Sequence, residues 1–330
     1  MIEEQASFDV KNFLRVYSPF IILIGLIVIA TFLSPVFLSK ENIFNIFRQE
    51  AAPMLLALGS MLVIVTGGID LSTGANLAIS NVIVAYFMTN IGLFTPGGVW
   101  VCILLGILIG LAFGCASGVI VAWLKMPSFI VTLAMMTMVR GVAYVITLGS
   151  PIRLPVDPQQ NVGSFAFFNF GQYGDPIIGM PYTAWIVIAF IIFFWFLMKY
   201  STFGRLIVAT GSNSDAARLA GINVKKYTFS AYAISGALAG VAGVLLTARA
   251  GIATPSAGTG WELDAIAAVV IGGASLAGGK GKVANTVVGV FIIALIANIM
   301  TLLAVPPYPQ QIIQGAIIIV AVLLNAGKDK

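Results

Sequence analysis

The chain contains a long stretch, residues 71–124, in which no lysine, arginine, aspartate or glutamate occurs. A soluble domain would have to bury such a stretch completely, whereas a bilayer accepts it as helices of roughly 20 residues each. The bias extends over all 330 residues, of which 59% are hydrophobic and 9% charged, while soluble domains carry about 25% charged residues. The sequence therefore predicts an all-α, polytopic bundle of membrane helices, because a helix satisfies its own backbone groups in lipid.

We expect about ten membrane-spanning helices, with eight or nine as alternatives. Turn residues divide the longest apolar stretches at 95–98 and at 306–309. The expected spans are 18–38, 50–68, 72–90, 98–124, 127–148, 180–200, 228–249, 263–278, 283–304 and 309–327. The eighth is short and rich in glycine, which favours a broken or re-entrant helix. Residues 1–330 are thus expected to form a single transmembrane domain in contact with lipid.

The positions of the positive charges indicate an orientation. With both termini on one side, twelve lysines and arginines fall on that side and four on the other, while Arg140 lies within a span. The twelve are Lys11, Arg15, Lys125, Lys199, Arg205, Arg218, Lys225, Lys226, Lys280, Lys282, Lys328 and Lys330, and the four are Lys40, Arg48, Arg153 and Arg249. Because cytoplasmic loops are enriched in positive charge, we expect both termini in the cytoplasm.

The residue inventory argues against metal or nucleotide chemistry in this chain. Histidine is absent, which removes the commonest metal ligand and the usual general base, so no metal site is expected. Cys102 and Cys115 share one apolar run and are expected to be buried helix residues. Lys280 and Lys282 stand among glycines, but Val283 follows where a phosphate-binding loop has serine or threonine. The chain is therefore not expected to hydrolyse ATP, and no feature predicts a nucleic-acid partner.

Glycines recur every four residues in the fourth expected span, at Gly106, Gly110, Gly114 and Gly118. Such a stripe lies on one face of a helix and lets another helix approach closely in lipid. It predicts a helix-packing surface and says little about a substrate.

The longest connection on the expected cytoplasmic side covers residues 199–227, and residues 211–222 within it have the composition of a short helix. Ser212 or Ser214 would cap its N-terminus, and Gly221 suits its C-terminal end. A helix this short cannot span the membrane. We expect it either to dock on another protein or to lie solvated on the membrane surface.

Four sequence motifs follow one another along the chain, at residues 67–74 (GGIDLSTG), at 127–141, at 211–227 and at 264–281. In these motifs and in their order, the chain resembles the permeases of ABC importers for ribose and related monosaccharides, from its first expected span to its last. Thr73 is a departure, because the family pattern leads us to expect valine before the glycine that follows.

The resemblance implies a transport subunit without enzymatic activity or a cofactor of its own, in a bacterial inner membrane. ATP and Mg²⁺ would be bound by a cytoplasmic ABC ATPase, a periplasmic sugar-binding protein would deliver the sugar, and a second permease copy or a paralogue would complete the transporter. The short cytoplasmic helix would be the coupling helix that enters a cleft of the ATPase. Its residues are Ser214, Asp215, Ala216, Ala217, Arg218, Leu219, Ala220 and Gly221.

Polar residues within the spans are candidates for a substrate path, since ionisable groups in lipid are costly. Arg140 would donate hydrogen bonds to sugar hydroxyls, or would bind backbone carbonyls or a carboxylate of a neighbouring helix. Asp70, Asn76 and Asn81 would line a cavity if a helix breaks at mid-membrane, or would cap a helix and bond across helices. Phe129, in the second motif, is a further candidate.

Trp261, Glu262 and Asp264 open the eighth expected span. An aromatic ring beside two carboxylates suits a sugar, through stacking and bidentate hydrogen bonds, and equally suits contact with a binding protein. The alternative is an interfacial tryptophan followed by acidic residues in the first helical turn.

Two other functions remain open at this stage. The solute of such a permease could be autoinducer-2 or another sugar-like molecule in place of ribose. A secondary transporter driven by protons or sodium would need a titratable cluster within the spans, for which Asp70 and Arg140 are the candidates. A membrane-embedded enzyme is disfavoured, because the spans hold no paired carboxylates.

Overall fold

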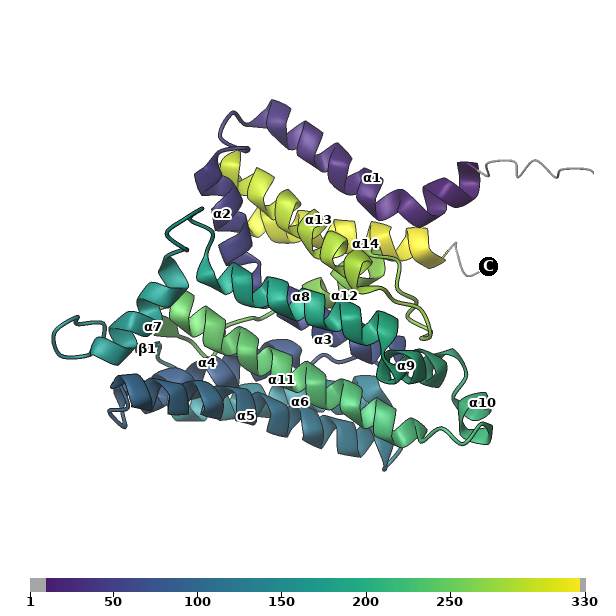
Figure 1. Cartoon of the computed structure of the whole chain (residues 1–330), viewed down its shortest axis with the longest axis horizontal. Helices are drawn as coiled ribbons and strands as arrows, with labels where there is room; N and C mark the ends of the chain where they lie inside the picture. Colours follow the sequence, from purple (N-terminus) through teal and green to yellow (C-terminus); the bar gives the residue numbers. More distant parts are fainter. Residues whose placement is uncertain (1–9, 327–330) are drawn as a thin grey trace, which may run out of the picture.

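The computed structural model describes residues 10–326, and helices dominate it (Figure 1). The helices are α1 (Val10–Leu33), α2 (Lys40–Gln49), α3 (Ala51–Val65), α4 (Thr73–Thr89), α5 (Pro96–Ala122), α6 (Ser128–Thr147), α7 (Val162–Gln172), α8 (Tyr182–Tyr200), α9 (Thr202–Ser212), α10 (Ser214–Leu219), α11 (Val224–Ala250), α12 (Trp261–Ile271), α13 (Val283–Leu302) and α14 (Pro307–Ala326). Two short strands, β1 (Ile152–Arg153) and β2 (Ile252–Ala253), pair antiparallel. The predicted all-α, polytopic class is confirmed.

Each of the ten expected spans overlaps one of these helices. Among the described residues, α5, α6, α8, α11 and α13 are long and apolar enough to cross a membrane, and α2 with α3 forms a sixth crossing if the bent pair is one span. Residues Ser18–Leu33 of α1 and the whole of α4 are shorter apolar helices. Ten crossings therefore stay a prediction. Lys328 and Lys330, which entered the orientation argument, lie outside the described residues, as does residue 327 of the last expected span.

Breaks occur directly before the second expected span and within the eighth. The helix of the second, α3, follows α2 after a bend of 45°. The helix of the eighth, α12, ends at Ile271 and is followed by turns. At 1.5 Å per residue its 11 residues extend about 16 Å, roughly half of a bilayer core of about 30 Å. A broken helix in this region agrees with the alternative that the glycine content favoured.

Helix α11 occupies the centre of the bundle. It packs against α5, α3 and α4, and in Figure 1 it runs between α5 and α8. Helices α1, α13 and α14 lie together on the side away from α5 and α6 (Figure 1). One end of the bundle, called here the α10 end, carries α9 and α10. The opposite end, called the strand end, carries α7 and the two strands (Figure 1).

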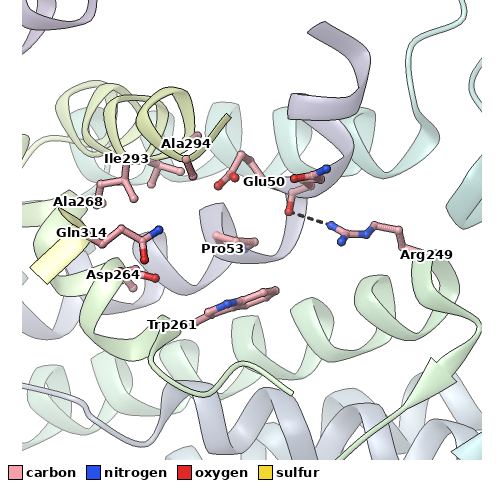
Figure 2. A pocket seen from close by; sticks show the side chains of 13 residues that line it. Glu50, Pro53, Arg249, Trp261, Asp264, Ala268, Ile293, Ala294 and Gln314 are labelled. Carbon is pink, nitrogen blue, oxygen red and sulfur yellow. Dashed lines mark hydrogen bonds between the residues drawn. The ribbon is translucent and has the colours of Figure 1, made fainter. Parts of the chain in front are cut away.

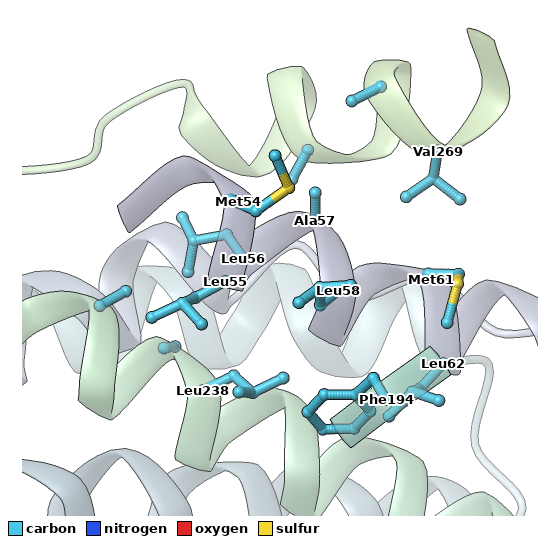
Figure 3. Packing of buried hydrophobic residues seen from close by; sticks show 14 of the residues in the cluster. Met54, Leu55, Leu56, Ala57, Leu58, Met61, Leu62, Phe194, Leu238 and Val269 are labelled. Carbon is cyan, nitrogen blue, oxygen red and sulfur yellow. The ribbon is translucent and has the colours of Figure 1, made fainter. Parts of the chain in front are cut away.

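The core is built around α3, in which every residue except Pro53 is buried. Its side chains are apolar on all sides of the helix, a composition that requires a fully enclosed position. Figure 3 shows Met54 and Met61 of α3 among the side chains of its neighbours, including Leu238 of α11 and Val269 of α12. Helix α3 is therefore enclosed by protein along nearly its whole length.

Glycines let α5 approach its neighbours closely. A Cβ atom at Gly110 would lie 2.5 Å from the Gly236 carbonyl oxygen, and one at Gly114 would lie 2.5 Å from a carbonyl oxygen of α11. Gly106 and Gly118 also face α4 or α11. All four glycines of the predicted stripe thus stand at contacts of α5 with these two helices.

The segment 199–227 contains two helices, α9 and α10, where one was expected. Ser212 ends α9, and the N-terminal cap of α10 is Asn213. The Asn213 side chain accepts hydrogen bonds from two backbone N–H groups of α10 at 3.1 and 2.9 Å. The expectation that Ser212 or Ser214 caps the helix is therefore wrong; asparagine is an equally good cap.

The C-terminal end of α10 follows the expected pattern. Gly221 has a φ of +80° and its N–H donates to the Arg218 carbonyl at 3.0 Å, while the Ile222 N–H donates to the Ala217 carbonyl at 3.0 Å. This is the left-handed helix end for which glycine is preferred.

Candidate functional site

The first turn of α12 presents two functional side chains on one face. The helix begins after Gly260, whose φ of +86° is a conformation that glycine adopts readily. Trp261 and Asp264 are three residues apart and so face the same side. Ala265 and Ala268 continue this face, and all four residues border the same cavity. The small alanines leave the space that the cavity occupies.

The cavity has a volume of about 190 Å³ and lies among six helices (Figure 2). Its lining consists of Gln49, Glu50, Pro53, Arg249, Trp261, Asp264, Ala265, Ala268, Val290, Ile293, Ala294, Ala297 and Gln314. These residues come from the α2–α3 junction, the last turn of α11, α12, α13 and α14. A single water molecule needs about 10–15 Å³ of such space, so the cavity accommodates a small solute.

The polar groups are distributed unevenly around the cavity. Asp264 and Gln314 lie together on one side, and Arg249 lies on the opposite side (Figure 2). The Trp261 ring lies between them, below Pro53 (Figure 2). Helix α13 adds a wall that is entirely apolar. The cavity therefore combines hydrogen-bonding groups with an aromatic ring and an aliphatic surface.

Arg249 holds the bend between α2 and α3. Its guanidinium donates a hydrogen bond to the Gln49 carbonyl oxygen at 3.2 Å, drawn as a dashed line in Figure 2. This oxygen belongs to the last turn of α2, where the helix dipole favours a cation. Glu50 stands at the bend itself, between the two helices. Two amide hydrogen bonds between Asn42 and Asn298, at 3.1 and 2.9 Å, fix α2 on α13.

Glu262 turns away from the cavity, although it stands between two residues that line it. Its side chain is buried, and its Oε1 accepts a hydrogen bond from the Gly260 N–H at 3.2 Å. A Cβ atom at Gly74 of α4 would collide with its Oε2 and with the backbone carbonyl oxygen of Gly258, which leaves room only for glycine there. Within the described part of the chain, Oε2 has no hydrogen-bond partner. Glu262 thus packs against α4 and does not border the cavity.

Asp70 lies in the connection between α3 and α4 and is 1% exposed. One carboxylate oxygen accepts from the Ser72 N–H at 2.9 Å and from the Ser72 hydroxyl at 2.6 Å. The other accepts from the Ser235 hydroxyl at 2.9 Å. The carboxylate therefore orders the turn before α4 and attaches it to α11, away from the cavity lining.

Asn81 and Arg140 both bind the loop that leads from β2 to α12. The Asn81 Oδ1 accepts from the Thr254 N–H at 3.0 Å. One guanidinium nitrogen of Arg140 donates to the carbonyls of Pro255 and Ala257 at 3.0 and 2.9 Å. Arg140 thus binds backbone carbonyls, which is the structural one of the two roles that the sequence left open for it. The contacts of Asn81 and Arg140 position the loop and hence the start of α12.

Asn76 and Phe129 also lie away from the cavity lining. Asn76 is fully buried in α4, and Phe129 is 51% exposed on α6. Of the eight path candidates named from the sequence, the structure brings only Trp261 and Asp264 to the cavity. A path role for the others stays a prediction.

Four polar residues of the cavity escaped the sequence reasoning: Gln49, Glu50, Arg249 and Gln314. Glu50 carried a signal, because it places a charge at the very start of an expected span. Gln314 carried a weaker one as a polar residue inside the span 309–327. Arg249 counted only as a charge on the outer side, and nothing local indicates that it reaches a residue 200 positions earlier.

The family model described as branched-chain amino acid transport system / permease component matches residues 42–322. The chain belongs to this family of permease components. It is 40% identical over 319 residues to the ribose import permease protein RbsC of Escherichia coli (strain K12), which covers 97% of this chain and 96% of that protein. The same comparison gives 41% over 325 residues for RbsC of Haemophilus influenzae (strain ATCC 51907 / DSM 11121 / KW20 / Rd), covering 98% and 97%. The D-allose transport system permease protein AlsC of Escherichia coli (strain K12) is 37% identical, covering 98% of this chain and 95% of that protein. No solved structure matches the chain.

As a permease component, the chain is a multi-pass membrane protein and a transport subunit. Its cavity lies where one helix is bent and another is short, the arrangement by which transporters place polar groups inside a helical bundle. The lining offers carboxylates that accept hydrogen bonds, amides that donate and accept, and an indole ring. In the described residues 10–326, no three His, Cys, Asp or Glu side chains gather as a metal site would require.

Proposed function

We propose that this permease component translocates a ribose-like monosaccharide across a bacterial inner membrane as the transmembrane subunit of an ABC importer. The observation that carries the proposal is the identity of about 40% to ribose import permeases over nearly the whole length of both chains. ATP and Mg²⁺ would be bound by a partner ATPase and not by this chain. A periplasmic binding protein would deliver the sugar, and a second permease copy or a paralogue would complete the path.

The shape of α10 supports an ATPase docking at the α10 end. Ala217 is buried against the rest of the protein, whereas Leu219 is 91% exposed. Asp215 and Arg218 form an exposed ion pair with an N–O distance of 3.1 Å. The helix is therefore anchored on one side and offers an apolar tip with charged flanks on the other, as a coupling helix would.

Contacts behind α10 support the transmission of motion to the core. Gly211, in the last turn of α9, abuts the Val65 carbonyl at the end of α3, and a Cβ atom at this position would collide with it. The same carbonyl accepts a hydrogen bond from the Gly279 N–H at 2.9 Å. A displacement of α9 and α10 would therefore reach both α3 and the segment after α12. With the α10 end in the cytoplasm, both termini would be cytoplasmic, in agreement with the charge distribution.

Uptake measurements test the proposal. Cells that lack their own ribose uptake would produce the chain with its ATPase and its binding protein, and accumulation of labelled D-ribose would be measured. We expect uptake that is lost when the ATPase is inactivated and that survives collapse of the proton gradient. Uptake that survives inactivation of the ATPase but is lost when the proton gradient collapses would identify an ion-coupled secondary transporter. Uptake of autoinducer-2 in place of ribose would identify autoinducer-2 as the substrate.

A pair of matched variants tests the docking role of α10. Leu219→Asp should lower the amount of ATPase that co-purifies with the chain by about tenfold, because a charge replaces an apolar contact at an interface. Ile177→Asp, at a position that is also 91% exposed but lies between α7 and α8, should have no effect. Equal ATPase recovery with both variants would place the docking site elsewhere.

A further inference from the structure

The cavity described above has the composition of a sugar-binding site. Trp261 provides a flat apolar ring, and Asp264 and Gln314 lie together beside it (Figure 2). Sugar rings have C–H faces that stack on indole and hydroxyl groups that both donate and accept. A carboxylate accepts hydrogen bonds from two hydroxyls, and an amide both donates and accepts. Trp261 would thus stack on the C–H face of a sugar, while Asp264 and Gln314 would form hydrogen bonds with its hydroxyl groups.

The charges of the lining favour a neutral ligand over an anionic one. Glu50 and Asp264 contribute two carboxylates, and Arg249 contributes one guanidinium. That guanidinium already donates to the Gln49 carbonyl oxygen at 3.2 Å. A sugar phosphate would therefore meet two carboxylates and one cation that is already engaged. A neutral polyol avoids this repulsion.

The size of the cavity points to a small solute. Its 190 Å³ lies below the roughly 300–1,000 Å³ of pockets for drug-sized ligands, and well above the space of one water. Ala265 and Ala268 line the side formed by α12, and Ala294 and Ala297 line the side formed by α13. Larger side chains at these positions would fill the space, so the alanines set the capacity of the site.

We infer that this cavity is a binding site for a neutral monosaccharide within the permease component itself, with Trp261 and Asp264 as its selecting residues. The inference rests on the proposed function and goes beyond it, because the choice of sugar would then not be left to the binding protein alone. Binding there should be weak, since a solute in transit must leave as readily as it enters.

A thiol-protection experiment tests binding without requiring transport. The full chain, with Cys102→Ala and Cys115→Ala, would carry Ala297→Cys in the cavity wall and would be purified in lipid nanodiscs. A small methanethiosulfonate reagent labels the new thiol. D-Ribose at ten times its Kd should slow labelling about tenfold, since about one site in eleven is then empty. Ser150→Cys, at an exposed position away from the cavity, is the control and should label at the same rate with or without the sugar.

Variants of the two selecting residues complete the experiment. Trp261→Ala and Asp264→Asn should each weaken D-ribose binding by about tenfold, as expected for loss of a stacking or charged hydrogen-bonding partner, so that at the same sugar concentration the protection falls from about tenfold to about twofold. Trp261→Phe should keep most of it, which covers the case that Trp261→Ala does not fold. Trp100→Ala and Asp157→Asn, at exposed positions, serve as matched controls and should leave it unchanged.

The outcomes separate this inference from the proposed function. No protection by D-ribose, D-xylose or D-allose, or protection that survives both Trp261→Ala and Asp264→Asn, would overturn the inference even where the cells accumulate ribose. Protection by ribose 5-phosphate or L-leucine in place of the neutral sugars would overturn it as well. Protection in nanodiscs without ATP-dependent uptake in cells would support the inference and count against the importer.

Discussion

The close approach of α5 and α11 makes Gly110→Ala a sharp test of how this bundle is held together. The Cβ atom would lie 2.5 Å from the Gly236 carbonyl oxygen and 2.8 Å from the backbone of Gly240. Both contacts are with backbone atoms, so no change of rotamer relieves them. The helices must move apart or bend.

The size of the effect follows from these distances. Ordinary contact begins at 3.4 Å, so the helices must separate by about 0.9 Å at this point. A gap of about 0.5–1 Å forfeits a quarter to a half of the dispersion attraction between the atoms concerned. Overpacking typically costs about 1–3 kcal/mol, and a contact between two backbones belongs at the upper end. We expect Gly110→Ala to lower the free energy of unfolding by about 3 kcal/mol.

Unfolding of the purified chain in mixed micelles by sodium dodecyl sulfate, followed by tryptophan fluorescence, measures this loss. The matched control is Gly25→Ala, because a Cβ atom at Gly25 of α1 meets no atom within 4 Å. Gly236→Ala, on the facing helix, should cost a similar amount, and the double variant should cost less than the sum because the helices are already apart. Identical transitions for Gly110→Ala and Gly25→Ala would refute the reasoning.

Three further substitutions probe polar contacts. Arg140→Met should destabilise the loop 251–260 by about 2 kcal/mol, since two loop carbonyls lose a charged donor; unchanged amide exchange in that loop would contradict the structural role of this arginine. Asp70→Ala should cost about 3 kcal/mol, because it removes the acceptor of three buried hydrogen bonds; a detergent-unfolding midpoint equal to that of the wild type would contradict this. The Ile178 N–H and, to a smaller extent, the Trp185 side chain donate hydrogen bonds to Asp175, and they hold the pKa of its carboxyl below the ordinary value of 3.8. The charged form therefore stabilises its loop above that pH, and the stabilisation is lost as pH falls through the lowered pKa; Asp175→Asn should abolish this dependence of amide exchange, corrected for intrinsic rates, and a retained dependence would refute the assignment.

The membrane helices themselves could be predicted from the sequence because the length of an apolar run is a local property. The expected span 127–148 corresponds to α6 at Ser128–Thr147, and the expected span 283–304 corresponds to α13 at Val283–Leu302. Proline and glycine mark the ends of these runs, so boundaries came within a few residues. The family motifs, also local, led to the correct class of transport subunit.

The cavity could be predicted only in part, because its residues meet through tertiary contacts. Trp261 and Asp264 attracted attention as an aromatic beside carboxylates, but Glu262 attracted the same attention. The position at which α12 begins, directly after Gly260, places Trp261 and Asp264 on one face of the helix and turns Glu262 toward α4. The bend at Glu50 was out of reach, since it depends on a hydrogen bond to α2 from the far end of α11.

Two of the helices that border the cavity, α3 and α12, also lead to the α10 end, and this joint placement bears on how a transport cycle would work. Helix α3 begins beside the cavity at Pro53 and ends at Val65, whose carbonyl meets Gly211 of α9 and Gly279. Its 15 residues extend about 22 Å and are packed on every side, so a displacement imposed at one end is not absorbed along the helix. Helix α12 begins beside the cavity and leads, through its turns, to the same contact. A displacement of α9 would therefore move α3 and α12, which form two walls of the cavity, together.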